Sequence, residues 1–359
     1  MCEPTYRSRR VPSPGVFLVM DKAKTEARAS GVSVVDLSIG ASDLQPPPEA
    51  LLALKESVDD PSTHSYCLKS GTMPLLEAAT EWYGQRYGVQ LDPATEALSL
   101  IGAQEGLAHA LLAVADVGDV ILMTSVAYPS YFGAVQVAGL VPHYLPLGPD
   151  LLPQLDRLTP QQLQAARVLL LNYPNNPTAA VASREFFQRA VDLCRQYGIL
   201  LVHDNPYVDL VFDESADSPS PLALPGGRDC VLELFSFAKS YHLGGFRLGF
   251  ALGNARAVAA LEAVKAPTDF NQYKGIMRMG VACLRLPRSV VRRDAGVWRR
   301  RAAAMVAALR EAGCEGVRMP GAGAGRARMW VGRREVWGIV WRREGMRWLG
   351  AGRSVALLF

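Results

Sequence analysis

Between residues 96 and 252, short apolar runs of strand length alternate with longer amphipathic stretches. The apolar runs do not switch strictly between polar and apolar residues, which is typical of strands buried on both faces of a sheet. Helices are expected between them at 104–115 and 184–197. This order predicts an α/β fold whose mainly parallel sheet is sandwiched by helices and whose ligands lie beyond the carboxyl ends of the strands. The expected strands are 97–101, 119–123, 143–147, 167–171, 199–203, 231–235 and 248–252.

The segments on either side of this block carry different signals. The N-terminal arm contains Pro12, Pro14 and the proline run 46–48, so it is predicted to be an extended segment that leads into the main domain. After the block, helices are expected at 255–265 and through much of 272–313.

Composition limits the partners and the compartment. No apolar run reaches the ~18–20 residues that a membrane span needs, and the basic N-terminus leads into VPSPG, not into the apolar core of a secretory signal. The cysteines are scattered without a C-x-x-C pair, which argues against a zinc site or a disulfide framework and favours the cytoplasm. They are Cys2, Cys67, Cys194, Cys230, Cys283 and Cys314.

Residues 321–359 differ in kind from the rest of the chain. They hold 8 Gly, 8 Arg and four of the six Trp, with no lysine and two acidic residues. The whole chain has 38 basic and 34 acidic residues, so 30 and 32 remain in 1–320, a net charge of −2 that gives no reason to expect nucleic-acid binding. Gly, Arg and Trp all have G-rich codons. We therefore interpret the tail as a frameshift near Pro320, and the alternative is a genuine Arg/Trp-rich surface tail.

A lysine motif follows the strand expected at 231–235. It runs Ser236-Phe-Ala-Lys239 and continues through two glycines to Arg247. A lysine among small residues can condense with an aldehyde, and the planar guanidinium of an arginine suits a phosphate. Ser236 can add a hydroxyl to the same phosphate. Taken alone, Lys239 would be an ordinary solvated lysine.

Two further motifs follow the strands expected at 199–203 and 167–171. The first places Asp204 and Tyr207 in His-Asp-Asn-Pro-Tyr, and the second places Asn176 in Asn-Tyr-Pro-Asn-Asn-Pro-Thr. Both supply polar groups at a predicted ligand-binding edge. Aspartate, asparagine and proline are also common in plain turns, so neither motif is specific by itself.

Two loops add a turn and an aromatic ring. Gly102, Ala103 and Gln104 lie between an expected strand and an expected helix, where backbone N–H groups bind phosphate well. Tyr128, in Tyr-Pro-Ser-Tyr, offers an aromatic face for stacking. A simple turn glycine and a core aromatic are the alternatives.

Together these motifs resemble those of the class I and II aminotransferases, fold type I enzymes of the aspartate aminotransferase superfamily that use pyridoxal 5′-phosphate (PLP). Their order and internal spacings match over residues 11–319, and the nearest branch is the prokaryotic one that includes LL-diaminopimelate aminotransferases. The resemblance implies that Lys239 carries PLP and that Asp204 pairs with the ring nitrogen. It also implies that Asn176 and Tyr207 bond the phenolic oxygen.

The resemblance assigns the other groups of the cofactor site as well. Tyr128 would stack on the ring. The family's Asn-Pro-Thr-Gly motif ends here in Ala179, a departure that affects the backbone after the turn. The implied phosphate ligands are Gly102, Ala103, Gln104, Ser236 and Arg247.

Two single-residue matches concern the substrate and the assembly. Tyr66 matches a tyrosine that reaches the phosphate of a neighbouring subunit, which implies a homodimer with shared active sites. Gly40 matches a glycine whose backbone contacts the substrate carboxylate, beside Asn176. The implied domains are an arm with part of a small, incomplete α/β domain (1–45), a large PLP-binding domain (46–270) and small-domain helices (271–320).

The implied reaction moves an amino group between an L-amino acid and a 2-oxo acid by a ping-pong mechanism, with Lys239 moving the protons. The alternatives are another fold type I reaction, such as a lyase or decarboxylase, and an inactive PLP-binding relative. The family's carboxylate-binding arginine has no convincing match in the tail, where Arg353 is the nearest candidate. We therefore expect the 359-residue chain to be poorly active or poorly soluble.

Overall fold

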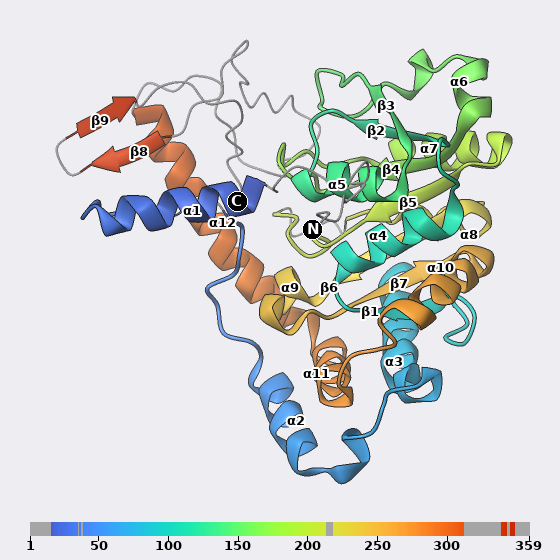
Figure 1. Ribbon diagram of the computed structural model, residues 1–359, viewed down its shortest axis with the longest axis horizontal. Coiled ribbons are helices and arrows are strands. Elements are labelled where there is room, and N and C mark those ends of the chain that lie inside the picture. The colour runs from blue at the N-terminus through green and yellow to red at the C-terminus, as the bar shows by residue number, and fades with distance from the viewer. Residues whose placement is uncertain are drawn as a thin grey trace, which may run out of the picture.

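The computed structural model describes residues 16–34, 36, 39–212 and 218–311, together with the backbone of two strands at 339–342 and 345–348. A seven-stranded sheet has the order β1-β7-β6-β5-β4-β2-β3 (Figure 1). Its strands run parallel except β7, which pairs antiparallel with both β1 and β6. The predicted α/β fold with a mainly parallel sheet is confirmed. The strands are β1 Ala97–Leu100, β2 Val120–Thr124, β3 Val141–Leu145, β4 Ala166–Leu171, β5 Leu200–Asp204, β6 Val231–Ser236 and β7 Gly249–Gly253.

Helices cover both faces of the sheet because the strands present apolar side chains on both sides. Alternate residues of β4 join two separate clusters of buried side chains, with Val168 and Leu170 in one and Leu169 and Leu171 in the other. Helices α4, α5 and α10 complete the first cluster, and α3 and α7 contribute to the second. The helices are α1 Val16–Ala29, α2 Pro48–Asp59, α3 Lys69–Tyr87, α4 Ala103–Val114, α5 Pro129–Ala138, α6 Pro160–Ala165, α7 Arg184–Tyr197, α8 Gly227–Cys230, α9 Phe237–Ser240, α10 Ala255–Thr268, α11 Lys274–Leu284 and α12 Arg288–Glu311.

Local signals explain where several helices begin and end. The hydroxyl of Ser183 accepts a hydrogen bond from the N–H of Phe186 at the start of α7, and Gly198 ends that helix in the left-handed region.

Helix α11 packs against α2 and α3, and the three gather below the sheet in Figure 1. Among the described residues, no helix combines the length and apolar character needed to cross a bilayer.

The prediction of an extended N-terminal arm is wrong for residues 16–29, which form α1. The two prolines lie before the helix, and the stretch itself is free of proline and glycine. It contains several strong helix formers. Gly31, at φ 79°, follows its end, and the N–H of Val32 bonds to the carbonyl of Ala27. The prolines therefore restrict where the helix starts without extending the whole arm.

The C-terminal tail is described only at two strands. β8 Ile339–Arg342 and β9 Gly345–Trp348 pair antiparallel, a hairpin that the tail's pattern did not predict. The frameshift hypothesis and the candidate Arg353 fall on residues outside the described part.

Candidate active site

The predicted site residues converge because of the strand directions. Strands β4, β5 and β6 are parallel neighbours, so the segments that follow them start from one edge of the sheet. β1 is antiparallel to β7, and β7 is antiparallel to β6. The carboxyl end of β1 and the amino end of β7 therefore lie at the same edge. This is why Gly102, which follows β1, and Arg247, which precedes β7, meet beside the loops after β4, β5 and β6.

Asp204 ends β5 and is 7% exposed. Its Oδ2 accepts a hydrogen bond of 2.5 Å from the Tyr131 hydroxyl, while its Oδ1 is buried with no partner among the described residues. Burial raises the pKa of this carboxyl to about 6, and the bond from Tyr131 acts in the opposite direction. Asp204 thus presents a buried carboxylate oxygen that can accept another hydrogen bond.

The loop after β4 is organised around Asn172. Its amide nitrogen donates to the backbone carbonyl of Asp204 at 2.8 Å, and its Oδ1 accepts from the N–H of Asn176 at 2.8 Å. Asn176 in turn donates to the Tyr207 hydroxyl at 3.0 Å, and its own Oδ1 is buried without a partner in the described chain. Burial raises the pKa of Tyr207, so its hydroxyl stays protonated at neutral pH and can donate.

Lys239 lies on α9, a short helix that directly follows β6. Its ammonium donates to the carbonyl of Gly40 and lies 5.6 Å from the centre of the Tyr207 ring. Burial lowers the pKa of Lys239, because a charged amine loses hydration in this position. The fold therefore brings four predicted positions together: Lys239, Gly40, Tyr207 and Asn176. The lowered pKa makes the Lys239 amine easier to deprotonate than an exposed lysine.

Gly102 and Arg247 form a close pair at the start of α4. Gly102 has φ 89°, a backbone conformation that favours glycine, and a Cβ there would lie 2.7 Å from Nη2 of Arg247, so the Arg247 side chain would have to shift. Arg247 itself is exposed, has φ 54° and donates to the carbonyl of Gly244 at 3.0 Å. Ala103 is buried and Gln104 is exposed in the first turn of α4. The helix N-terminus and the guanidinium together favour an anion.

Ser236 and Tyr128 flank this pair. The hydroxyl of Ser236 accepts a hydrogen bond from the N–H of Ala238 at 3.1 Å, which caps α9. The Tyr128 hydroxyl donates to the side-chain oxygen of Gln104 at 3.4 Å, and its ring lies 5.6 Å from that of Tyr131. Because Tyr131 bonds Asp204, contacts run from the turn at Gly102 through Tyr128 to the carboxylate.

Tyr66, by contrast, is largely exposed to solvent in this chain. Its side chain is 87% exposed and contacts the ring of Phe270 with the centroids 5.9 Å apart. Phe270 is also exposed and has φ 57°, a conformation that strains a bulky residue.

Sequence reasoning missed Tyr131 and Asn172 as site residues. Tyr131 was visible in the Tyr-Pro-Ser-Tyr segment, one helical turn after Tyr128, and Asn172 opens the loop that carries Asn176. The signal available was their proximity to assigned residues. Their hydrogen bonds depend on the fold, because Tyr131 and Asp204 are 73 positions apart.

Comparison with known proteins identifies the family. The sequence pattern of the family described as aminotransferase class I and II matches residues 32–317. The chain belongs to this family. The LL-diaminopimelate aminotransferase of Nitratidesulfovibrio vulgaris is 36% identical over 304 residues, which cover 84% of this chain and 78% of that protein. The enzyme of the same name from Aquifex aeolicus is 35% identical over 308 residues, which cover 85% and 79%.

A solved structure extends this similarity. It is that of a probable N-succinyldiaminopimelate aminotransferase from Thermus thermophilus, with 55% identity, a TM-score of 0.80 and coverage of 82% of this chain and 80% of that one. The present chain is accordingly a PLP-dependent aminotransferase. Membership of the family does not favour the lyase, decarboxylase and inactive alternatives.

The residues present fit PLP. The cofactor needs an amine, an acceptor for its ring N–H, donors for its phenolic oxygen and a site for a dianionic phosphate. Lys239 supplies the amine, and Asp204 has a buried oxygen without a partner among the described residues. Tyr207 and Asn176 supply hydroxyl and amide groups at 3.0 Å from each other. The cradle of Gly102 and Arg247 would be filled by a Cβ at the glycine.

Proposed function

We propose that this aminotransferase acts on a substrate of the diaminopimelate class and that Lys239 holds PLP. The observation that carries the assignment of the site is the buried Asp204 with one unpartnered oxygen, at the same sheet edge as a lysine of lowered pKa. A buried carboxylate oxygen that lacks a partner is costly, so its retention at a ligand-binding edge favours a cationic or N–H donor partner in the loaded protein.

Each residue has a stated chemical task in this proposal. When bound, PLP supplies an electron-withdrawing ring that stabilises negative charge at the substrate Cα. Asp204 would hold a positive charge at the ring nitrogen, while Tyr131 fixes the orientation of the carboxylate. Lys239, as a neutral amine, removes the Cα proton and later returns a proton, acting first as general base and then as general acid.

The remaining residues bind and orient. Asn176 and Tyr207 would bond the phenolic oxygen, and Tyr128 would stack on the ring. The turn Gly102–Gln104, Ser236 and Arg247 would bind the phosphate through backbone N–H groups, a hydroxyl and a guanidinium. The segment of Gly40, whose carbonyl accepts a bond from Lys239, would contact the substrate carboxylate through its backbone.

The substrate class is proposed from the relatives. The curated relatives compared above are named LL-diaminopimelate aminotransferases, and the Thermus thermophilus protein is named a probable N-succinyldiaminopimelate aminotransferase. The names share the diaminopimelate skeleton, with or without a succinyl group on one nitrogen. We propose that this chain takes one of these two forms as amino donor and a small 2-oxo acid as acceptor.

The assembly and compartment are also part of the proposal. The exposed aromatic rings of Tyr66 and Phe270 lie side by side. We propose that a homodimer forms in which Tyr66 reaches the phosphate site of the partner. The chain would act in the cytoplasm, with residues 46–270 as the large domain and segments before and after it as the small one.

The experiment is a spectroscopic titration of the purified protein with PLP, followed by addition of single amino acids. We expect a visible band from lysine-bound cofactor that is lost on adding LL-diaminopimelate or its N-succinyl derivative, but not on adding alanine at the same concentration. Lys239→Ala should lack the band, while Lys22→Ala, at an exposed lysine of α1, should keep it. Cofactor that stays covalently attached to Lys239→Ala after borohydride reduction and denaturation would refute the assignment.

A second measurement tests the reaction type. Formation of 2-oxo acid should require an amino acceptor beyond the first turnover if the enzyme transfers the amino group. Sustained production without any acceptor would instead indicate a lyase.

Equilibrium sedimentation of wild type and Tyr66→Ala, with PLP affinity measured alongside, tests the proposed dimer. The variant should lose PLP affinity although it keeps Lys239.

A further inference from the structure

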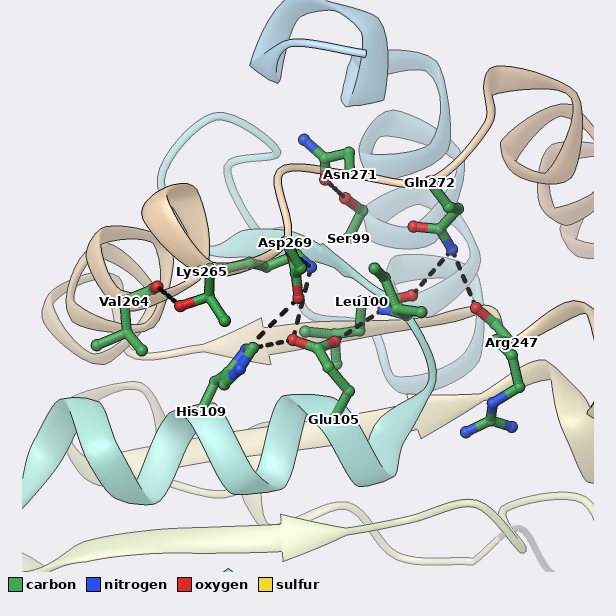
Figure 2. Close-up of polar contacts among 12 residues, drawn as sticks. Ser99, Leu100, Glu105, His109, Arg247, Val264, Lys265, Asp269, Asn271 and Gln272 are labelled. Carbon is green, nitrogen blue, oxygen red and sulfur yellow. Dashed lines mark hydrogen bonds and ion pairs between the residues drawn. The ribbon is translucent and has the colours of Figure 1, made fainter. Parts of the chain in front are cut away.

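Gln272 lies outside the motifs that identify the family's cofactor ligands, yet its side chain bridges two parts of the phosphate cradle. Its amide nitrogen donates to the carbonyl of Leu100 at 3.2 Å and to the carbonyl of Arg247 at 3.1 Å (Figure 2). Leu100 is the last residue of β1 and precedes the turn at Gly102. One side-chain amide therefore holds both chain segments that bring Gly102 and Arg247 together.

The contact with Arg247 matters because its backbone is strained. Arg247 has φ 54°, in the left-handed region that a non-glycine residue adopts at a cost. It stands just before β7, where Leu100 pairs with Gly249. Without the amide, the Arg247 carbonyl is free to rotate toward a relaxed conformation. The guanidinium, which lies against Gly102, would move with it.

The loop that carries Gln272 is anchored on both sides. Asn271 accepts a hydrogen bond from the Ser99 hydroxyl at 2.8 Å and donates to the carbonyl of Cys67 at 3.1 Å. Asp269 pairs at 2.6 Å with Lys265, whose side chain is almost fully buried. The loop thus joins β1 to the segment that presents Tyr66.

A charged cluster completes this anchor. Lys265 also lies 3.5 Å from Oε1 of Glu105, whose Oε2 accepts from the N–H of Ile101 at 2.8 Å. His109 approaches Glu105 and Asp269 from the next turn of α4 (Figure 2). The ammonium of Lys265 supplies positive charge between the two carboxylates, so the cluster serves as an anchor that connects the loop to the first turn of α4.

We propose that Gln272 is a positioning residue for the cofactor phosphate, acting through the backbone of Leu100 and Arg247. The proposal rests on the proposed function, in which Gly102 and Arg247 bind that phosphate. It predicts an effect that depends on the phosphate group of the ligand. A residue that supports only the fold would change the affinity for phosphorylated and unphosphorylated cofactor equally.

The test compares the dissociation constants of PLP and pyridoxal, measured by absorbance titration of cofactor-free full-length protein. Gln272→Met keeps the length of the side chain and removes its donors. We expect it to reduce the preference for PLP over pyridoxal by about tenfold, since two hydrogen bonds that fix an anion site are lost. Gln188→Met is the matched control, because Gln188 also donates to a backbone carbonyl, that of Pro225, and lies on α7, which carries no residue of the cradle.

Each outcome bears on one proposal. An unchanged preference in Gln272→Met, or an equal loss of affinity for both ligands, overturns the role of Gln272. A wild-type protein that binds pyridoxal as tightly as PLP contradicts the proposed phosphate site itself. If Gln272→Met does not fold, Gln272→Asn serves in its place, because it keeps the donors but shortens the reach by one methylene. It should lose preference in the same direction.

Discussion

Two buried carboxylates on neighbouring strands have opposite surroundings. Glu233 in β6 is fully buried and fully paired: His203 Nδ1 donates to its Oε1 at 2.8 Å, Asn205 donates to the same oxygen at 3.0 Å, and the Ser220 hydroxyl donates to Oε2. Asp204, at the end of β5, has one bond, from Tyr131, and one oxygen without a described partner. The two carboxylates are close in the sheet, since Asp204 pairs with Leu234 in the register.

The difference indicates that Glu233 stabilises the fold, whereas Asp204 is available to bind a ligand. The network of Glu233 continues through Ser220 to the Tyr83 hydroxyl at 2.6 Å and thereby connects β6 to α3. A fully satisfied buried network of this kind holds one arrangement of the fold. A partly satisfied carboxylate costs stability and gains binding capacity, a combination that is common at functional sites. Variants of the two residues should therefore affect different properties.

The largest effect is expected from Asp204→Asn on the reaction. The amide keeps the shape and the bond from Tyr131 but removes the negative charge that faces the cofactor ring. We expect the single-turnover rate with the amino donor to fall by about 10³-fold, as for the loss of a preorganised electrostatic group. Stopped-flow absorbance of PLP-loaded protein measures this rate. A loss of less than tenfold would assign the charge at the ring nitrogen to another group.

The second effect is expected from Glu233→Leu on stability. This change leaves His203, Asn205 and Ser220 buried without their acceptor, so the free energy of unfolding should fall by about 3–5 kcal/mol. Urea unfolding of the cofactor-free protein measures the loss. The matched control is Glu262→Leu, which removes a surface pair with Lys69 and should cost no more than about 1 kcal/mol. Equal losses in the two variants would mean that the Glu233 network stabilises the fold no more than a surface ion pair does.

The third prediction concerns pH and the cofactor-free protein. Burial raises the pKa of Asp204 from 3.8 to about 6, so the folded state binds a proton more readily than the unfolded state between these values. The contribution of Asp204 to the free energy of unfolding of the wild type therefore falls as pH rises from about 4 to 6, and it stays low above that range. Asp204→Asn lacks this dependence. The stability of Asp204→Asn relative to wild type should therefore rise by roughly 2 kcal/mol across the window.

Denaturation midpoints at pH 4 and pH 7 in both proteins decide this point. A stability difference that does not change with pH would mean that the carboxyl has an ordinary pKa in the folded protein. A difference that changes in the opposite sense would mean that the charged form is stabilised by a partner.

The strands and the edge of the sheet were predictable because their signals are local. Runs such as 167–171 and 231–235 are apolar and of strand length, and the direction rule for parallel strands places the following motifs together. Helix α3 was not assigned, because Gly71 and Pro74 interrupt its pattern. It is held by packing, since Leu75 and Leu76 are fully buried, and such tertiary stabilisation leaves little local signal.

Single side-chain contacts were the least predictable part of the site. The roles of Tyr131 and Gln272 depend on atoms 25 to 172 positions away. A sequence pattern gives the element on which a residue lies, but the direction of its side chain follows from packing among several elements. The sequence also could not predict that one oxygen of Asp204 lacks a partner, because this depends on the positions of all the polar groups around it in the described fold.

The smallest effect is expected at Ala179, where the sequence departs from the family's Asn-Pro-Thr-Gly motif. Ala179 has φ 56°, and its N–H bonds to the carbonyl of Asn175 at 2.7 Å, so the turn has a conformation that suits the glycine of the Asn-Pro-Thr-Gly motif that this segment resembles. The left-handed region costs an L-residue about 1–2 kcal/mol, and glycine loses about 0.4–1 kcal/mol more in unfolded-state entropy. Ala179→Gly should therefore raise the free energy of unfolding by roughly 0.5–1 kcal/mol.

Urea midpoints of Ala179→Gly and Ala180→Gly measure this gain against a control at the next position. Ala180 is buried and lies outside the left-handed region, so glycine there should lower stability by about 1 kcal/mol. If the free energy of unfolding rises in Ala179→Gly and falls in Ala180→Gly, the strain lies in the φ angle of Ala179, in the loop that carries Asn176. If both variants lose stability, the turn holds Ala179 without strain, and the loop's geometry must then be set by the hydrogen bonds of Asn172 and Asn175 alone.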